Sequence, residues 1–369
     1  MNKRKLFYKD ISGLRFVATI FIYVYIIAYL LFAKEVTEIG TQFGPFVSTL
    51  KNIGISIFLI ISSFLLTAHA LREYKHTDRF NLKNFYIRRL LRLVPTLILV
   101  LTFFIVIHPL VVNFLKLNPI TDISAIEQIV FFPSYRLKIS NEVFIYLFFI
   151  YGIFLLLQYY FFWGLVLKYL RRYLPYILSI LFVIGIIFRC LPNTAEFTTD
   201  LFLPFYFVEI AIGGTVAIIV REKSRIVNII KSFSKSQITA IYLFSILAVV
   251  SIYLLTNSVY TALVGKVVLY CLIGFFIIEQ TYSKQSITKI RNKTFIIEFG
   301  NLSYSFILFA PIVAVMTLIT FESVEIELAS RVTIMAFPMI CFLLTWFLST
   351  LNKHYIEDFF ERVKKSFKT

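Results

Sequence analysis

The sequence predicts an all-α, polytopic integral membrane protein with about ten transmembrane helices and both termini in the cytoplasm. Composition is the first reason, because 59% of the 369 residues are apolar and 15% are charged, whereas a soluble domain has about 45–50% apolar and about 25% charged residues. The second reason is that long apolar stretches recur along the chain with short polar breaks between them. The third is that basic residues gather in alternate breaks, as the topology of a membrane protein requires.

The apolar stretches fix the predicted helices. A helix that rises about 1.5 Å per residue needs about 20 apolar residues to cross a hydrocarbon core of about 30 Å. In chain order, the stretches that meet this length are residues 14–33, 52–71, 93–112, 143–167, 176–191, 201–220, 238–255, 259–278, 302–319 and 332–351. Residues 1–351 therefore form a transmembrane domain, and residues 352–369 form a basic cytoplasmic tail.

The polar breaks orient these helices. Basic residues occur at the N-terminus, in the even-numbered breaks and in the tail, for example Lys3, Arg4, Arg72, Arg88, Arg171, Arg221, Lys284, Lys289 and Lys364. The first break instead carries Glu35 and Glu38, and the ninth carries Glu325 and Glu327. Cytoplasmic loops are the ones enriched in Lys and Arg. The formal charge of +17 is therefore a topology signal, and nucleic acid is not an expected partner.

The tail is predicted to be an amphipathic helix. Ile356, Phe359, Phe360, Val363 and Phe367 recur at helical spacing, opposite three lysines. Such a helix suits the anionic surface of the inner leaflet, with membrane lipids as partners. A solvated helical end with ordinary topology charges is the alternative. The three cysteines show none of the close spacing that metal or redox motifs use, and we expect no metal.

A few polar residues in or beside the apolar stretches are candidates for function. Arg88 and Arg92 are one helical turn apart, so they share a face with room for an anionic ligand, and Arg89 lies next to them. Lipid headgroup anchors are the alternative for these arginines. Arg15 and Glu209 fall inside predicted membrane helices, where a charge is costly and usually has a partner or a wet cavity.

Several local sequences resemble acyltransferase family 3, membrane-bound enzymes that move acyl groups, often acetyl, onto sugars of cell-surface polymers. The resemblance covers most of the chain, which would make residues 1–351 an acyltransferase-3-like transmembrane domain. The residues that carry it are Gly13-Leu14-Arg15 in the first helix, residues 54–66 in the second, and residues 79–95, whose Arg-x-x-x-Arg pair is Arg88 and Arg92. Weaker similarities occur at Gln158-Tyr159-Tyr160, Asn301-Leu302-Ser303 and Tyr355-Ile356-Glu357.

The sequence departs from the family pattern at polar positions. The pattern places a histidine, thought to be the catalytic base, eleven residues after the arginine of the first helix, and here that residue is Ile26. An acidic pair is replaced by Leu156-Leu157, and a later Trp-His by Phe309-Ala310. His69 lies near the inner end of the second helix, well short of the missing base, which should lie about 17 Å above Arg15. The candidates for a catalytic role are thus Arg15, His69 and Glu209.

The resemblance implies a specific activity. It is O-acylation, mainly acetylation, of a cell-surface or extracellular polysaccharide in the inner (plasma) membrane, with acyl-coenzyme A (acyl-CoA) as cytoplasmic donor on Arg88, Arg89 and Arg92. The glycan acceptor and polysaccharide biosynthesis proteins would be partners. Because the base is missing, an inactive relative that acts in polysaccharide export or assembly is an alternative. A small-solute transporter is a second alternative, which depends on the ten helices and Glu209.

Overall fold

The computed structural model describes residues 3–33, 39–107, 110, 141–190, 203–222, 224–254, 259–283, 285–286, 293–324 and 330–365. Every regular element in these residues is a helix, and they contain no strand. The elements are α1 (Lys3–Ala33), α2 (Ile39–Thr77), α3 (Leu82–Thr102), η1 (Phe103–Ile107), α6 (Asn141–Tyr169), η2 (Arg171–Tyr173), α7 (Leu174–Cys190), η4 (Leu203–Tyr206), α8 (Phe207–Arg221), α9 (Arg225–Ser232), α10 (Lys235–Leu254), α11 (Val259–Tyr282), α12 (Thr294–Ser323), α13 (Arg331–Asn352), η6 (Lys353–Glu357) and α14 (Asp358–Lys365). The predicted all-α fold is confirmed.

Within the described residues, eight helices are long and apolar enough to cross a membrane. They account for all the predicted stretches except the third and fourth. The third corresponds to α3 and η1, whose first half carries four basic residues, and the fourth corresponds to α6. A polytopic membrane protein is therefore confirmed. The sequence did not predict α9, a short amphipathic helix that buries Val227 and Ile230.

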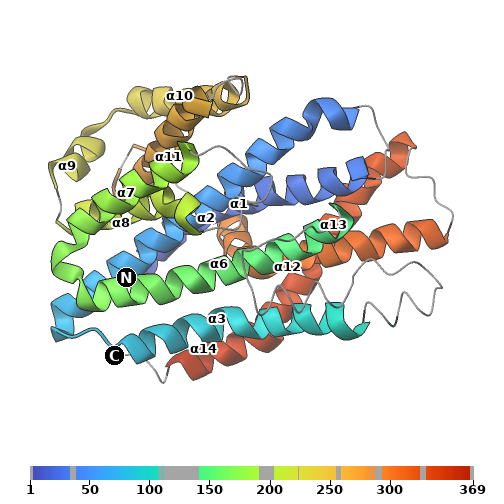
Figure 1. Ribbon diagram of the computed structural model, residues 1–369, viewed down its shortest axis with the longest axis horizontal. Helices are drawn as coiled ribbons and strands as arrows, with labels where there is room; N and C mark the ends of the chain where they lie inside the picture. The colour runs from blue at the N-terminus through green and yellow to red at the C-terminus, as the bar shows by residue number, and fades with distance from the viewer. Residues whose placement is uncertain are drawn as a thin grey trace.

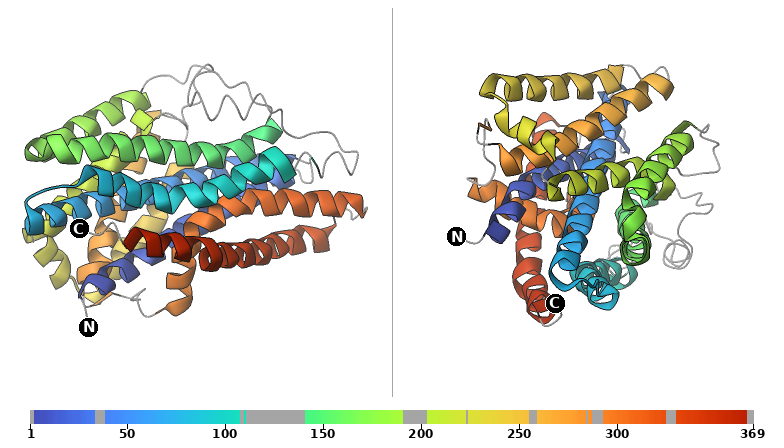
Figure 2. Two further views of the ribbon diagram at one scale, coloured as in Figure 1. Left: turned by 90° about the horizontal axis from the view of Figure 1, so that it is seen from below. Right: turned by 90° about the vertical axis from the view of Figure 1, so that its left-hand side faces the viewer.

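Helices α1 and α2 form the centre of the molecule. Helix α1 packs against α2 and α12, and α2 packs against α8. Figures 1 and 2 show α1 and α2 between α10 and α11 on one side and α3 and α14 on the other. Two glycines let these helices approach closely. A Cβ atom at Gly213 would collide with the carbonyl oxygen of Ile60, and one at Gly300 would collide with that of Ser12, so the central contacts depend on small residues.

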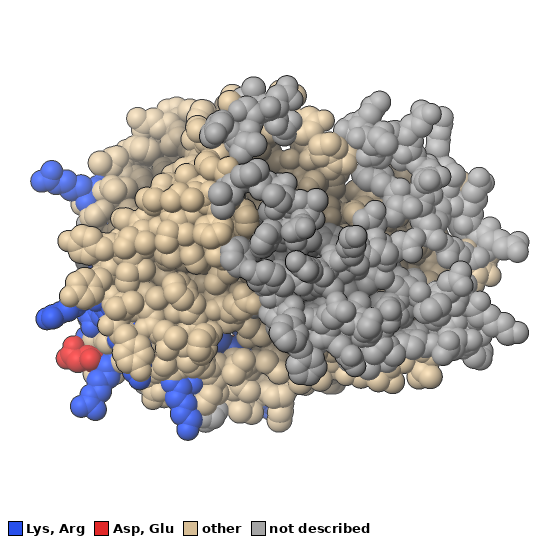
Figure 3. All heavy atoms as spheres, viewed as in Figure 1, with Lys and Arg blue, Asp and Glu red and all other residues tan. Residues whose placement is uncertain are grey.

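Both termini lie at the same end of the helical body (Figure 1). The Lys and Arg side chains visible in Figure 3 gather at that end. This arrangement agrees with an even number of crossings and with the charge pattern of the breaks. Glu35, Glu38, Lys284, Lys289, Glu325 and Glu327 lie outside the described residues. The cytoplasmic assignment of this end remains a prediction.

Candidate active site

The turn between α2 and α3 is held by one carboxylate. The backbone N–H of Asn81 donates to Glu73 Oε1 at 2.9 Å, and Arg88 Nη2 lies 3.3 Å from Glu73 Oε2. Asn81 caps α3, because its side chain accepts a hydrogen bond from the N–H of Asn84 at 3.0 Å. Asp78 has φ 51°, a left-handed conformation that Asp tolerates better than most residues. Glu73 thus fixes the start of α3, and with it the positions of the arginines that follow.

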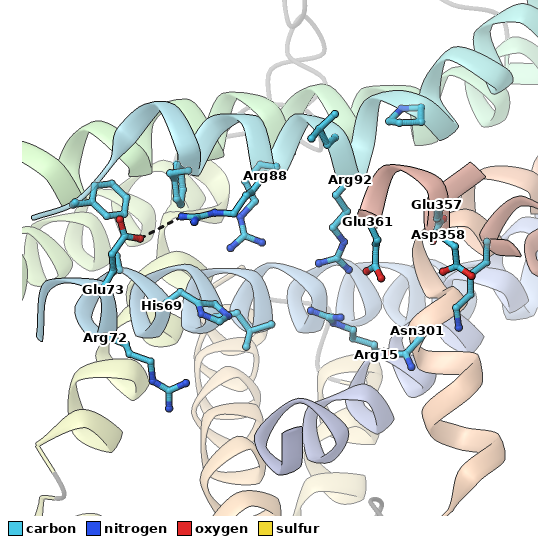
Figure 4. A pocket seen from close by; sticks show the side chains of 18 of the residues that line it. Arg15, His69, Arg72, Glu73, Arg88, Arg92, Asn301, Glu357, Asp358 and Glu361 are labelled. Atoms are coloured by element: carbon cyan, nitrogen blue, oxygen red, sulfur yellow. Dashed lines mark hydrogen bonds and ion pairs between the residues drawn. The ribbon is translucent and has the colours of Figure 1, made fainter. Parts of the chain in front are cut away.

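A cavity of about 870 Å³ lies between α2, α3, α14 and the inner part of α1 (Figure 4). Its polar lining residues are Arg15, His69, Arg72, Glu73, His76, Thr77, Arg88, Arg89, Arg92, Asn301, Lys353, Glu357, Asp358 and Glu361. The structure therefore brings together five of the six site residues that the sequence predicted. The exception is Glu209, which does not line this cavity.

The one-turn spacing of Arg88 and Arg92 has the predicted effect. Both side chains point from α3 into the cavity (Figure 4). Arg88 forms a salt bridge with Glu73, whereas Arg92 lies farther along α3, opposite Arg15. Guanidinium groups that converge in this way can bind an anion with several oxygens through charge-assisted hydrogen bonds.

Arg15 reaches the cavity from α1. Helix α1 is tied to α12 beside it, because Ser12 Oγ donates to Asn301 Oδ1 at 3.3 Å, and Asn301 also lines the cavity. Arg92 and Arg89 both act electrostatically on Arg15, and each repels its positive charge. An anion bound among the three guanidinium groups would relieve this repulsion. Arg15 is thus placed in a polar cavity, which supports the functional hypothesis over snorkelling.

Arg89 is held by aromatic rings. Its guanidinium carbon lies 5.7 Å from the ring centre of Phe85 and 5.9 Å from that of Tyr160, within the range of a cation–π contact. Within the described part of the chain its buried Nε has no hydrogen-bond partner. A buried N–H without a partner is costly, and an anionic ligand would supply one.

Helix periodicity explains the other lining residues of α2. His69 lines the cavity, and Arg72, Glu73 and His76 follow it at three- and four-residue intervals on the same face. In the sequence, Arg72 stands out only as a topology charge, and Glu73, Asp358 and Glu361 carry no signal of a site. No pattern in the sequence indicates that α14 folds back onto α3.

Comparison with known proteins identifies the family. A family model described as "Acyltransferase domain" matches residues 8–352. The chain belongs to acyltransferase family 3. Staphylococcus aureus proteins of strains COL and MW2, both named "Putative O-acetyltransferase", are 45% identical over 49 residues, which are 13% of this chain and 8% of each relative. The chain thus matches only a small part of these curated relatives, and no solved structure matches it.

The acyltransferase-3 position of the catalytic histidine is filled with apolar side chains in this chain. Ile26 and Ala310 are both 0% exposed and belong to one apolar cluster with Phe306 and Val313. Leu157 and Phe309 pack against the same cluster. Three of the positions where the sequence departs from the family pattern, Leu157, Phe309 and Ala310, are thus in or against the same hydrophobic core as Ile26, whereas Leu156 packs against other clusters.

Glu209 belongs to a separate buried network in this acyltransferase-3 member. Arg189 Nη2 donates to both carboxylate oxygens of Glu209 at 2.6 and 2.7 Å, and Ser56 Oγ donates at 2.8 Å. Arg189 also donates from Nε to the carbonyl of Phe205 at 2.8 Å and from Nη1 to Tyr270 Oη at 3.1 Å. Both carboxylate oxygens of Glu209 and all three guanidinium nitrogens of Arg189 therefore have hydrogen-bond partners, and the network joins α2, α7, α8 and α11. The sequence hypothesis of a polar cavity at Glu209 is not supported by this structural pairing.

Replacing Glu209 with Gln is expected to lower the free energy of unfolding by about 1–3 kcal/mol, because Arg189 then keeps its buried charge with a neutral partner. Thermal unfolding of the detergent-solubilised protein measures this as a lower Tm. The double variant Glu209→Gln/Arg189→Gln should recover part of the loss, since no uncompensated charge remains. Glu222→Gln, on an exposed carboxylate, is the control. An unchanged Tm for Glu209→Gln would contradict a stabilising role for the pair.

Proposed function

We propose that the protein is a membrane-bound O-acyltransferase that takes an acyl group from cytoplasmic acyl-CoA and transfers it to a hydroxyl of a cell-surface or extracellular polysaccharide. The observation that carries the proposal is the cavity lined by five arginines at the end of the molecule where basic side chains and both termini gather. The family membership supports acyl transfer. The names of the Staphylococcus aureus relatives favour acetyl as the acyl group.

The donor would bind through its phosphates. Arg88, Arg89 and Arg92 present guanidinium groups from one helix, and such groups match phosphate oxygens in geometry and charge. In the reaction the acceptor oxygen attacks the thioester carbonyl carbon, the C–S bond breaks, and coenzyme A leaves as the thiolate. Arg15 and Asn301, on adjoining helices, are the side chains suited to stabilise the oxyanion of that step.

The acceptor hydroxyl must lose a proton in the same step. Ile26 cannot accept it. His69 lines the cavity and remains the histidine candidate for this role. The expected location is the inner (plasma) membrane, where a cytoplasmic donor and an exported glycan can both reach the protein.

The apolar cluster around Ile26 favours a second candidate function. In it the protein binds an acyl-CoA or related anion but transfers no acyl group, and it serves polysaccharide export or assembly together with biosynthesis proteins. The transporter alternative depended on Glu209, which is bonded to Arg189 and does not line the cavity.

Two measurements on the purified protein separate these functions. Equilibrium binding of CoA reports on the cavity, and labelled acetyl-CoA with a cell-envelope polysaccharide fraction reports on transfer. Binding with transfer that is lost in His69→Asn supports the enzyme, and binding without transfer supports the second candidate. Absence of CoA binding would overturn both. Arg225→Gln, an exposed arginine of α9 outside the cavity, is the matched control.

A further inference from the structure

The two ends of the basic cavity differ in charge (Figure 4). Arg72 and Arg88 lie at the end nearest the α2–α3 turn, where Glu73 is the carboxylate of the lining. Glu357 and Asp358 lie at the opposite end, near Asn301, and Glu361 lies between them and Arg92. We call these the α2–α3 end and the α14 end. Three carboxylates and one cation, Lys353, therefore stand in the part of an anion-binding cavity that lies farthest from the turn, so this end carries a net negative charge.

These carboxylates come from one short segment that follows the part of the chain matched by the family model, which ends at residue 352. The segment consists of η6 and α14, and both pack against α3. It is anchored through Asn352, whose Nδ2 donates to Glu357 Oε1 at 3.0 Å and to Thr96 Oγ1 at 3.2 Å. Glu357 thus has a structural partner that explains its position.

Asp358 and Glu361 are not explained in the same way. Both line the cavity, and within the described residues neither side chain makes a hydrogen bond or an ion pair. By helical spacing they also lie on the face of α14 opposite Phe359 and Val363, which are 52% and 38% exposed; Asp358 is half-buried and Glu361 is exposed. The helical spacing of α14 therefore places both carboxylates on its cavity side, with Glu361 at the exposed rim.

We propose that Asp358 and Glu361 are specificity-determining residues that exclude phosphate from the α14 end of the cavity. A phosphate there would meet two further negative charges, one on half-buried Asp358 and one on exposed Glu361, and repulsion between like charges would weaken its binding. Uncharged groups meet no such penalty. A donor of the kind assigned under the proposed function, on which this inference rests, would then lie with its phosphates at Arg88, Arg89 and Arg92. Its pantetheine and thioester would lie toward Arg15 and Asn301.

The test removes the two charges while keeping the shapes of the side chains, in the variant Asp358→Asn/Glu361→Gln. Pyrophosphate is the probe, because it carries phosphate charge without the uncharged arm of the donor. Calorimetry of the purified full-length protein should give one bound pyrophosphate in the wild type and two in the variant. The first should bind roughly tenfold more tightly in the variant, with a steeper dependence on salt. CoA should still bind with one molecule per chain in both.

The outcomes separate this inference from the proposed function. Equal pyrophosphate stoichiometry and affinity in wild type and variant would overturn the exclusion. Failure of the wild type to bind CoA would instead overturn the proposed function. Glu222→Gln removes an exposed carboxylate outside the cavity and should behave as wild type. If the double variant does not fold, Glu361→Gln alone tests the same point, because a substitution of an exposed residue should leave folding intact. The gain in pyrophosphate affinity should then be smaller, since only one charge is removed.

Discussion

Replacing Arg88 and Arg92 together with Gln should weaken CoA binding by about 100-fold. Each guanidinium would lose a charge-assisted hydrogen bond to phosphate worth about 1.5 kcal/mol or more, so the pair contributes about 3 kcal/mol. Arg88 is already bonded to Glu73 in the empty cavity, at 3.3 Å, and the ligand must compete for it. We therefore expect Arg92→Gln alone to cause the larger part of the loss. Equilibrium binding of CoA to the purified variants measures both effects.

The same experiment tests the alternative that these arginines are lipid anchors. Anchors would affect insertion and stability in the membrane but not the affinity for CoA. The control is Arg225→Gln, which removes one exposed arginine of α9 without touching the cavity. Unchanged CoA affinity in the double variant, with normal insertion, would leave only the anchor hypothesis for Arg88 and Arg92.

The fold could be predicted closely from the sequence because membrane helices obey a strong constraint. Lipid offers the backbone no hydrogen-bond partners, so an apolar stretch of sufficient length must form a helix. This is why the boundaries of α10 and α13 differ from the prediction by only a few residues. Helix α9 was missed because eight residues are too few to span a membrane, and it is stabilised by burying Val227 and Ile230 rather than by length.

The candidate site was only partly predictable. Spacing on one helix predicted that Arg88 and Arg92 share a face, since neighbours on a helix face can be read directly from sequence, and both side chains line the same cavity. Contacts between distant segments could not be read in this way. Ser56 and Glu209 are 153 residues apart in the chain, yet they share a hydrogen bond. The partner of Glu209, Arg189, and the carboxylates of α14 likewise became apparent only when the helices were placed together.

Acyl transfer by the family's usual route should be slower by a factor of about 10²–10⁴ in this protein than in a family member that has the histidine. The variant Ile26→His should not restore the rate. The loss of the general base accounts for the lower rate of transfer. The rescue should fail because Ile26, Ala310 and Phe306 form one closed apolar cluster. An imidazole there would have no hydrogen-bond partner and should cost about 1–3 kcal/mol of stability. Turnover of labelled acetyl-CoA by wild type and variant, with their Tm values, is the measurement.

Ile26→Val is the matched control, since it keeps an apolar side chain at the same place and should leave turnover unchanged. An increase of 100-fold or more in Ile26→His would show that a polar cavity survives around position 26 and would contradict the packing argument. Fast turnover by the wild type that also survives His69→Asn would place the base elsewhere. The chemistry would then take place away from position 26, where the surroundings are apolar: Leu157, Phe309 and Ala310 all belong to or pack against the cluster of Ile26. A single histidine cannot recreate a site whose surrounding polar groups are gone.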